Sequence, residues 1–188
     1  IIGYINYIRL IKNLINGKKI ISSGMRGEIE RAKIAIEYAL HGYNTSLVSR
    51  GDPGVYGMAG LVFEICKKMN VNPDIKIIPG ITAGNAAAAL LGAPLMCDYA
   101  VLNLSDLLIP WEKIRTRLIS VAKSDLVAVI YNPKSRNRPN YIVETKEIFM
   151  NYRDENTPVG VVKDAFYSGE MVSIRTVSYT HLTLPTKA

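Results

Sequence analysis

Short apolar segments alternate with helical segments along this chain, and this alternation constrains its fold most. Apolar, often β-branched runs predict strands at residues 18–22, 45–49, 75–80, 99–105, 125–131 and 157–165. Apolar residues at helical spacing predict helices within residues 1–17, 26–42, 56–69, 82–92, 111–123 and 141–153. Strands that are apolar on both faces and alternate with helices are typical of parallel sheets covered by helices. The predicted fold class is therefore α/β.

Length and composition indicate a globular chain with two halves. The 188 residues are 48% hydrophobic and 21% charged, which suits one large domain or two small ones. The segment 92–98 is typical of a connection between two domains, so we expect domains at 1–96 and 97–176. No apolar run approaches the roughly 18 residues of a membrane span. The cysteines, Cys66 and Cys97, lack metal-ligand spacing, which favours free thiols, no bound metal and a cytoplasmic location.

The net charge of +7 favours a polyanionic partner, such as a nucleic acid, an acidic membrane surface or a multiply carboxylated small molecule. The densest basic cluster lies at residues 132–140 and contains Lys134, Arg136 and Arg138. A solvated loop is the alternative interpretation of such a cluster. A basic nucleic-acid-binding α/β protein also remains an alternative, although the dispersed charge and the lack of aromatic stacking positions argue against it.

Two turns rich in small residues follow predicted strands. The first, "SRGDPGVYG" at 49–57, contains Gly51 and Asp52; the second, "PGITAGNAAAA" at 79–89, contains Thr82. Ligands of open α/β sheets bind beyond the carboxyl ends of the strands, and glycine lets a ligand approach the backbone. The alternatives are a helix-capping turn for Asp52 and close helix packing for the alanines. The pattern G-x-x-x-x-G-K-[ST] of a phosphate loop is absent.

Four segments together give the chain a family resemblance. "SRGDPGVYGMAGLVFEI", "PGITAGNAAAALLGAPLM", "LSDLLIPWEKI" and "YNPKSRNRP" resemble the tetrapyrrole methylase superfamily over about residues 3–175. Within it they are similar to the ring-contracting C(17)-methyltransferases of cobalamin biosynthesis, which act on a precorrin-3B-type tetrapyrrole. The resemblance implies a two-domain fold with a cofactor cleft between the domains. It also implies S-adenosylmethionine as methyl donor, S-adenosylhomocysteine as product, and a homodimer without nucleic-acid or membrane partners.

The same resemblance assigns roles to individual positions. It implies that the cofactor is bound by Arg50, Gly51, Asp52, Val55, Thr82, Ala83, Tyr131, Asn132, Asp164 and Ala165. Ring contraction involves proton transfers, for which Asp98, Ser105 and Asp106 are the candidates, with Cys97 as a weaker one. Their structural alternatives are a turn residue for Asp98 and a helix cap for Asp106. The carboxylates of the tetrapyrrole would pair with Lys134, Arg136 and Arg138.

The sequence also departs from the family pattern. The first strand of the family and its glycine-rich loop have no counterpart, so we expect a chain truncated at both ends, with an unrelated tail at 177–188. Cys97 stands where the family pattern has histidine, and Arg50 where a small residue is usual. A methyltransferase that acts at a different carbon of the macrocycle remains an alternative.

Overall fold

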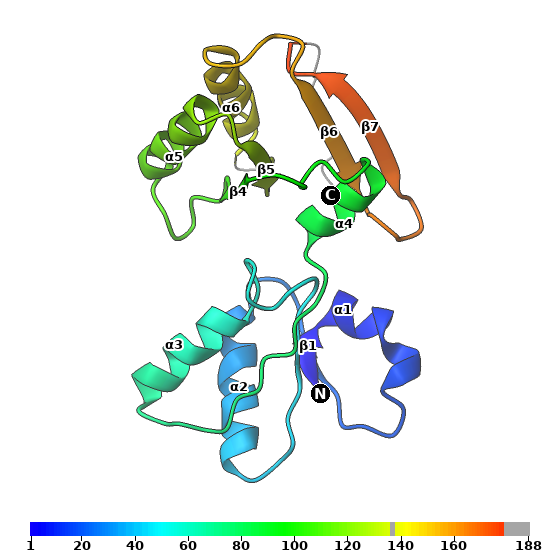
Figure 1. Ribbon diagram of the computed structural model, residues 1–188. Coiled ribbons are helices and arrows are strands. Elements are labelled where there is room, and N and C mark those ends of the chain that lie inside the picture. Colours follow the sequence, from blue (N-terminus) through cyan, green and yellow to red (C-terminus); the bar gives the residue numbers. More distant parts are fainter. Residues whose placement is uncertain (136–137, 179–188) are drawn as a thin grey trace. The chain divides into compact units, whose positions relative to one another are not determined.

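The computed structural model describes residues 1–135 and 138–178, which form two compact units that divide after Thr82 (Figure 1). The first unit contains β1 (Ile2–Tyr4), α1 (Ile5–Leu10), a 3-10 turn (Lys12–Leu14), β2 (Ile21–Ser23), α2 (Glu28–Leu40), β3 (Leu47–Val48) and α3 (Ala59–Met69). The second contains α4 (Ala83–Leu90), β4 (Tyr99–Asn103), α5 (Trp111–Lys123), β5 (Val127–Tyr131), α6 (Tyr141–Met150), β6 (Pro158–Lys163) and β7 (Met171–Thr176).

A parallel sheet in the order β2-β1-β3 forms the centre of the first unit. Ile2 pairs with Ile21 on one side and with Leu47 on the other, and its side chain is only 1% exposed. Helix α2 contacts β1, and α3 packs against α2 (Figure 1). The buried core between the helices consists of Ala32, Ile36, Ile65 and Cys66. The predicted α/β arrangement with a parallel sheet is confirmed here.

Two predicted elements of the first unit differ in the structure. The helix expected over residues 1–17 is preceded by strand β1, because the backbone of residues 2–4 pairs with two neighbouring strands at once. Helix α1 is correspondingly short. The strand predicted at 75–80 is wrong, since this segment pairs with no strand among the described residues and the N–H of Gly80 donates to a side chain instead.

In the second unit β4 and β5 pair in parallel, whereas β6 and β7 form an antiparallel hairpin that the sequence pattern did not predict. Helices α5 and α6 lie side by side over a core that includes Leu104, Leu118 and Ile148 (Figure 1). Helix α4 contacts β5 and β6, so the structure divides after Thr82, ahead of the boundary expected near residue 96.

The second unit continues into the first two residues of the expected tail. The N–H of Val177 donates to the carbonyl oxygen of Thr157 (2.9 Å), and Val177 is 6% exposed. The N–H of Ser178 donates to the carbonyl oxygen of Glu155 (3.2 Å). Residues 179–188 lie outside the described residues.

Candidate functional site

The carboxylate of Asp52 organises the glycine-rich turn after β3. The backbone N–H of Gly54 donates to its Oδ1 (2.7 Å), and that of Gly80 donates to its Oδ2 (3.0 Å). These donors, Gly80 foremost, hold the pKa of the Asp52 carboxyl below its ordinary value because they stabilise the anion. The side chain therefore joins the two small-residue turns.

The backbones of these turns approach so closely that glycine is required. A Cβ on Gly80 would overlap the carbonyl oxygen of Gly51, and a Cβ on Gly57 would lie 2.5 Å from that of Pro53. Gly51 itself adopts a left-handed conformation with φ of +70°. Of the predicted cofactor residues in this unit, Arg50 and Val55 are exposed and Thr82 is half-buried. The first unit thus brings together the predicted residues 50–55 and the segment that leads to Thr82.

The carboxyl ends of β4 and β5 carry a second group of predicted residues. Asn103 and Tyr131 are opposite one another in the parallel pair. Asn103 Oδ1 accepts from the side-chain amide of Asn132 (3.0 Å) and from the N–H of Ser105 (2.9 Å). Tyr131 Oη accepts a hydrogen bond from the N–H of Gly84 (2.6 Å), in the first turn of α4. Tyr131, Asn132, Ser105 and the start of α4 at Ala83 consequently form one constellation.

Asn132 and Asp164 share a backbone feature. Each is the first residue after a strand, β5 and β6 respectively, and each has a positive φ, of 51° and 50°. Asn and Asp are the non-glycine residues that tolerate this region best. Ligands of open α/β sheets bind beyond such strand ends. Asp164 and Ala165 are half-buried.

Asp106 and Arg138 contact each other. Arg138 Nε lies 3.4 Å from Asp106 Oδ1, and Tyr141 Oη donates to Asp106 Oδ2 (2.8 Å). The hydrogen bond to Asp106 raises the pKa of the Tyr141 phenol. The Tyr141 ring stacks on Trp111, with centroids 3.8 Å apart. Asp106 is therefore held by the side chains of Arg138 and Tyr141. It does not cap α5, whose N-cap residue is Pro110.

The remaining predicted residues are dispersed. Asp98 is exposed and precedes β4, so the five-residue strand, about 16 Å long, separates it from Ser105 and Asp106. Exposed Cys97 lies at the same amino end. Lys134 is half-buried in the loop after β5, and Arg136 lies outside the described residues. The three proton-transfer candidates are therefore not brought together.

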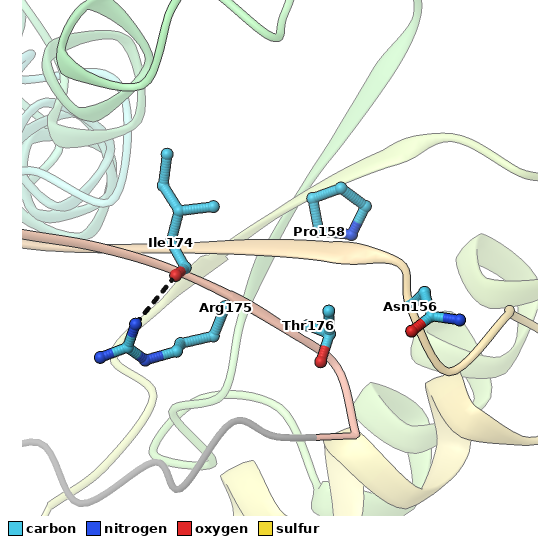
Figure 2. Close-up of a pocket in the computed structure, with 5 residues that line it drawn as sticks. All are labelled: Asn156, Pro158, Ile174, Arg175 and Thr176. Carbon is cyan, nitrogen blue, oxygen red and sulfur yellow. Dashed lines mark hydrogen bonds between the residues drawn. The ribbon is translucent and has the colours of Figure 1, made fainter.

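A pocket of the second unit contains none of the predicted residues. Figure 2 shows its lining, where the Arg175 guanidinium donates to the carbonyl oxygen of Ile174 (3.4 Å). The other lining residues are Asn156, Pro158 and Thr176. Its lining offers a single charged side chain and no acid–base pair, so it is not the candidate site.

Sequence reasoning missed three residues that complete these constellations. From the sequence, Gly80 is part of a turn, Asn103 is part of a strand and Tyr141 begins a helix, and none of the three is predicted to contact another site residue. Asn103 carries a detectable signal, because an amide side chain closes an otherwise apolar strand. Tyr141 carries none, since its partner Asp106 is distant in sequence.

Two broader features bear on the class of site. Within the described ranges, no three His, Cys, Asp or Glu side chains are grouped so that they could hold a metal ion. None of the helices described is long and apolar enough to cross a membrane. Each unit carries polar groups suited to a polar ligand: glycine backbone and the Asp52 carboxylate in the first, and amides and a basic loop in the second.

Comparison with known proteins places this geometry in a family. Residues 10–178 match the tetrapyrrole (corrin/porphyrin) methylases. A probable cobalt-factor III C(17)-methyltransferase of Salmonella typhimurium is 45% identical over 165 residues, which cover 88% of this chain and 68% of that protein. Three further curated relatives are longer, and the chain spans 33–46% of their lengths.

Solved structures agree with this match. The crystal structure of the methyltransferase CobJ has a TM-score of 0.89 at 34% identity and covers 95% of this chain and 76% of that one. Uroporphyrin-III C-methyltransferase from Thermus thermophilus, complexed with S-adenyl homocysteine, has a TM-score of 0.64 at 18% identity. It covers 95% of this chain and 75% of that one, and supports the fold alone. Since the family match covers residues 10–178 and the Salmonella relative is 45% identical over 165 residues, the chain belongs to the tetrapyrrole methylases.

Proposed function

We propose that this chain is an S-adenosylmethionine-dependent methyltransferase that methylates carbon 17 of a precorrin-3B-type tetrapyrrole, with ring contraction, in cobalamin biosynthesis. The observation that carries the proposal is the 45% identity to the Salmonella relative, together with the 34% identity to CobJ. Because the relative is named for cobalt-factor III, that cobalt-containing tetrapyrrole is the first substrate to test.

The residues of the first unit fit the proposed cofactor. When bound, S-adenosylmethionine supplies an electrophilic methyl group on a positively charged sulfur. Asp52 is held as an anion and retains acceptor capacity beyond its two backbone donors, which suits a cationic amine. Gly51 and Gly80 are exposed, and Arg50, Val55 and Thr82 lie within four residues of one or the other along the chain. These residues form the first part of the proposed cofactor site.

In the second unit the proposed cofactor contacts are Ala83, Tyr131, Asn132, Asp164 and Ala165. The positive φ at Asn132 and Asp164, and the anchoring of the α4 start by Tyr131, support this part of the proposal. Methyl displacement depends chiefly on positioning and exclusion of water, so a site without a strong acid or base is sufficient for it.

Ring contraction additionally requires proton transfer. Ser105, after the carboxyl end of β4, shares the acceptor Asn103 Oδ1 with Asn132, which supports its role. Asp106 follows it and contacts Arg138 and Tyr141. Asp98 and Cys97, at the other end of this strand, stay predictions. Lys134 and Arg136 are proposed to pair with carboxylates of the macrocycle.

A binding and product assay tests the proposal. S-adenosylhomocysteine should bind this chain in a calorimetric titration, and cobalt-factor III should gain one methyl group, located at carbon 17 by NMR. The Salmonella relative is the matched positive control. Methylation at another carbon would replace the C(17) assignment by the alternative, and absence of S-adenosylhomocysteine binding in an assay where the relative binds would overturn the cofactor proposal.

Assembly and location are also part of the proposal. We expect a homodimer, as the family resemblance implies, and a cytoplasmic location, which the free cysteines favour. Sedimentation velocity of this chain at several concentrations would test the dimer.

A further inference from the structure

Arg138 is a basic residue whose guanidinium is already occupied. Its Nε edge faces Asp106 Oδ1 at 3.4 Å, and its Nη1 donates to the carbonyl oxygen of Leu104 (2.6 Å). The side chains of Arg138 and Asp106 are 14% and 31% exposed. Asp106 and Leu104 therefore occupy the Nε and Nη1 sides of the guanidinium, which leaves a further carboxylate fewer of its five N–H donors.

The contacts of Arg138 join two loops at one end of the β4–β5 pair. Leu104 and Asp106 belong to the loop after β4, whereas Arg138 belongs to the loop after β5. Tyr141 adds a hydrogen bond from the start of α6 to the same Asp106 carboxylate. The stack of Tyr141 on Trp111 then fixes the end of the first loop at the start of α5.

The first loop carries two neighbouring exposed leucines. Leu107 and Leu108 are 84% and 95% exposed and directly follow Asp106. A tetrapyrrole has a flat apolar ring with an anionic rim, so exposed apolar side chains next to a basic loop match its two kinds of surface. A loop that is fixed before binding loses less conformational entropy when it contacts such a ring.

We infer that Arg138 is a positioning residue, which holds the Leu107–Leu108 loop against the loop after β5 through Asp106 and Leu104, rather than a direct ligand of a substrate carboxylate. The part that concerns substrate rests on the proposed function. The part that concerns the loops does not depend on it.

Hydrogen exchange of the ligand-free chain tests the loop contact. Arg138→Gln and Asp106→Asn should each speed amide exchange in both loops, 104–110 and 138–141, by about tenfold, the loss expected from a charged hydrogen bond. The effect of the double variant should be smaller than the product of the two single effects, because both single variants remove the Arg138–Asp106 contact. Arg115→Gln is the matched control. Arg115 of α5 pairs with Glu144 of α6 (3.7 Å), and both side chains are exposed. Faster exchange in one loop only would overturn the inference.

Porphyrin binding tests the positioning role. In titrations of uroporphyrin, an octacarboxylate, at several salt concentrations, Arg138→Gln and Asp106→Asn should weaken binding alike and leave the salt dependence unchanged. Lys134→Gln, which removes a proposed direct contact, should reduce the salt dependence. Tighter binding by Asp106→Asn, with a reduced salt dependence for Arg138→Gln, would identify Arg138 as a direct ligand and overturn the inference. If the unsubstituted chain binds no porphyrin, the substrate proposal fails while the exchange experiment still decides the loop contact.

Discussion

Backbone donors rather than a basic side chain lower the pKa of the Asp52 carboxyl. Both of its oxygens accept N–H groups, from Gly54 and from Gly80, which is 28 residues away in sequence. The motif predicted a special role for Asp52, but the Gly80 partner follows only from the fold. The same holds for Asp106, whose partners Arg138 and Tyr141 are 32 or more residues distant.

Gly80→Ala should disrupt the turn, because its Cβ would overlap the carbonyl oxygen of Gly51. We expect a loss of about 1–3 kcal/mol in the free energy of unfolding, and loss of S-adenosylhomocysteine binding. Gly60→Ala is the control, since a Cβ there meets nothing within 4 Å in α3, and it should stabilise by up to about 1 kcal/mol. Urea denaturation and calorimetry measure both effects. Equal stability of the two variants would contradict the close approach.

Asp52→Asn should change how stability depends on pH. The folded pKa lies below the ordinary value of 3.8, so the carboxylate contributes stability that is complete above that value. This contribution is lost as pH falls through the folded pKa. The melting temperature of the variant should therefore be lower at neutral pH and decline less in acid. Asp74→Asn, which removes an exposed carboxylate from the same unit, should retain the steeper acid decline. Parallel acid limbs for Asp52→Asn and the parent would argue against this role.

At the scale of elements, periodicity predicted helices well and short strands poorly. Helix α2 was predicted, but its apolar residues Ile29 and Leu40 are 58% and 49% exposed, whereas Arg31 is 5% exposed. Arg31 is buried because it donates to Ser23 Oγ and to the carbonyl oxygen of Gly24 on the preceding loop. Strand β1 was not predicted, because the isoleucines of residues 1–17 follow a helical spacing. A strand also depends on pairing with neighbours that are distant in sequence.

The side chain of Arg153, which follows α6, donates hydrogen bonds to carbonyl oxygens at the C-terminal end of α5. Its guanidinium donates to the carbonyl oxygens of Ala122 (2.7 Å), Val121 (3.0 Å) and Leu126 (3.1 Å), and it pairs with Asp125. Its side chain is 11% exposed. Carbonyl groups at a helix end need such donors.

Arg153→Lys should destabilise the second unit by about 1–3 kcal/mol, because an ammonium cannot reach all of these acceptors. Trp111 is the only tryptophan of the chain and lies in α5, so its fluorescence during urea unfolding reports on this unit. Arg115→Lys, at an exposed ion pair, should change stability by less than about 0.5 kcal/mol. A similar shift in both variants would show that the carbonyl contacts contribute little.

For the whole molecule, the net charge of +7 predicted a polyanionic partner but could not choose between nucleic acid and a polycarboxylate. The family match selects a tetrapyrrole methylase. If its charge serves substrate binding, uroporphyrin should bind more tightly than a DNA duplex at salt of about 0.15 M, where non-specific DNA binding is weak. The octamethyl ester of the same porphyrin keeps the ring and lacks the anionic rim, so it should bind more weakly. Fluorescence titrations compare the three ligands. Tighter binding of DNA than of uroporphyrin would revive the nucleic-acid alternative, and equal binding of acid and ester would assign recognition to the apolar ring alone.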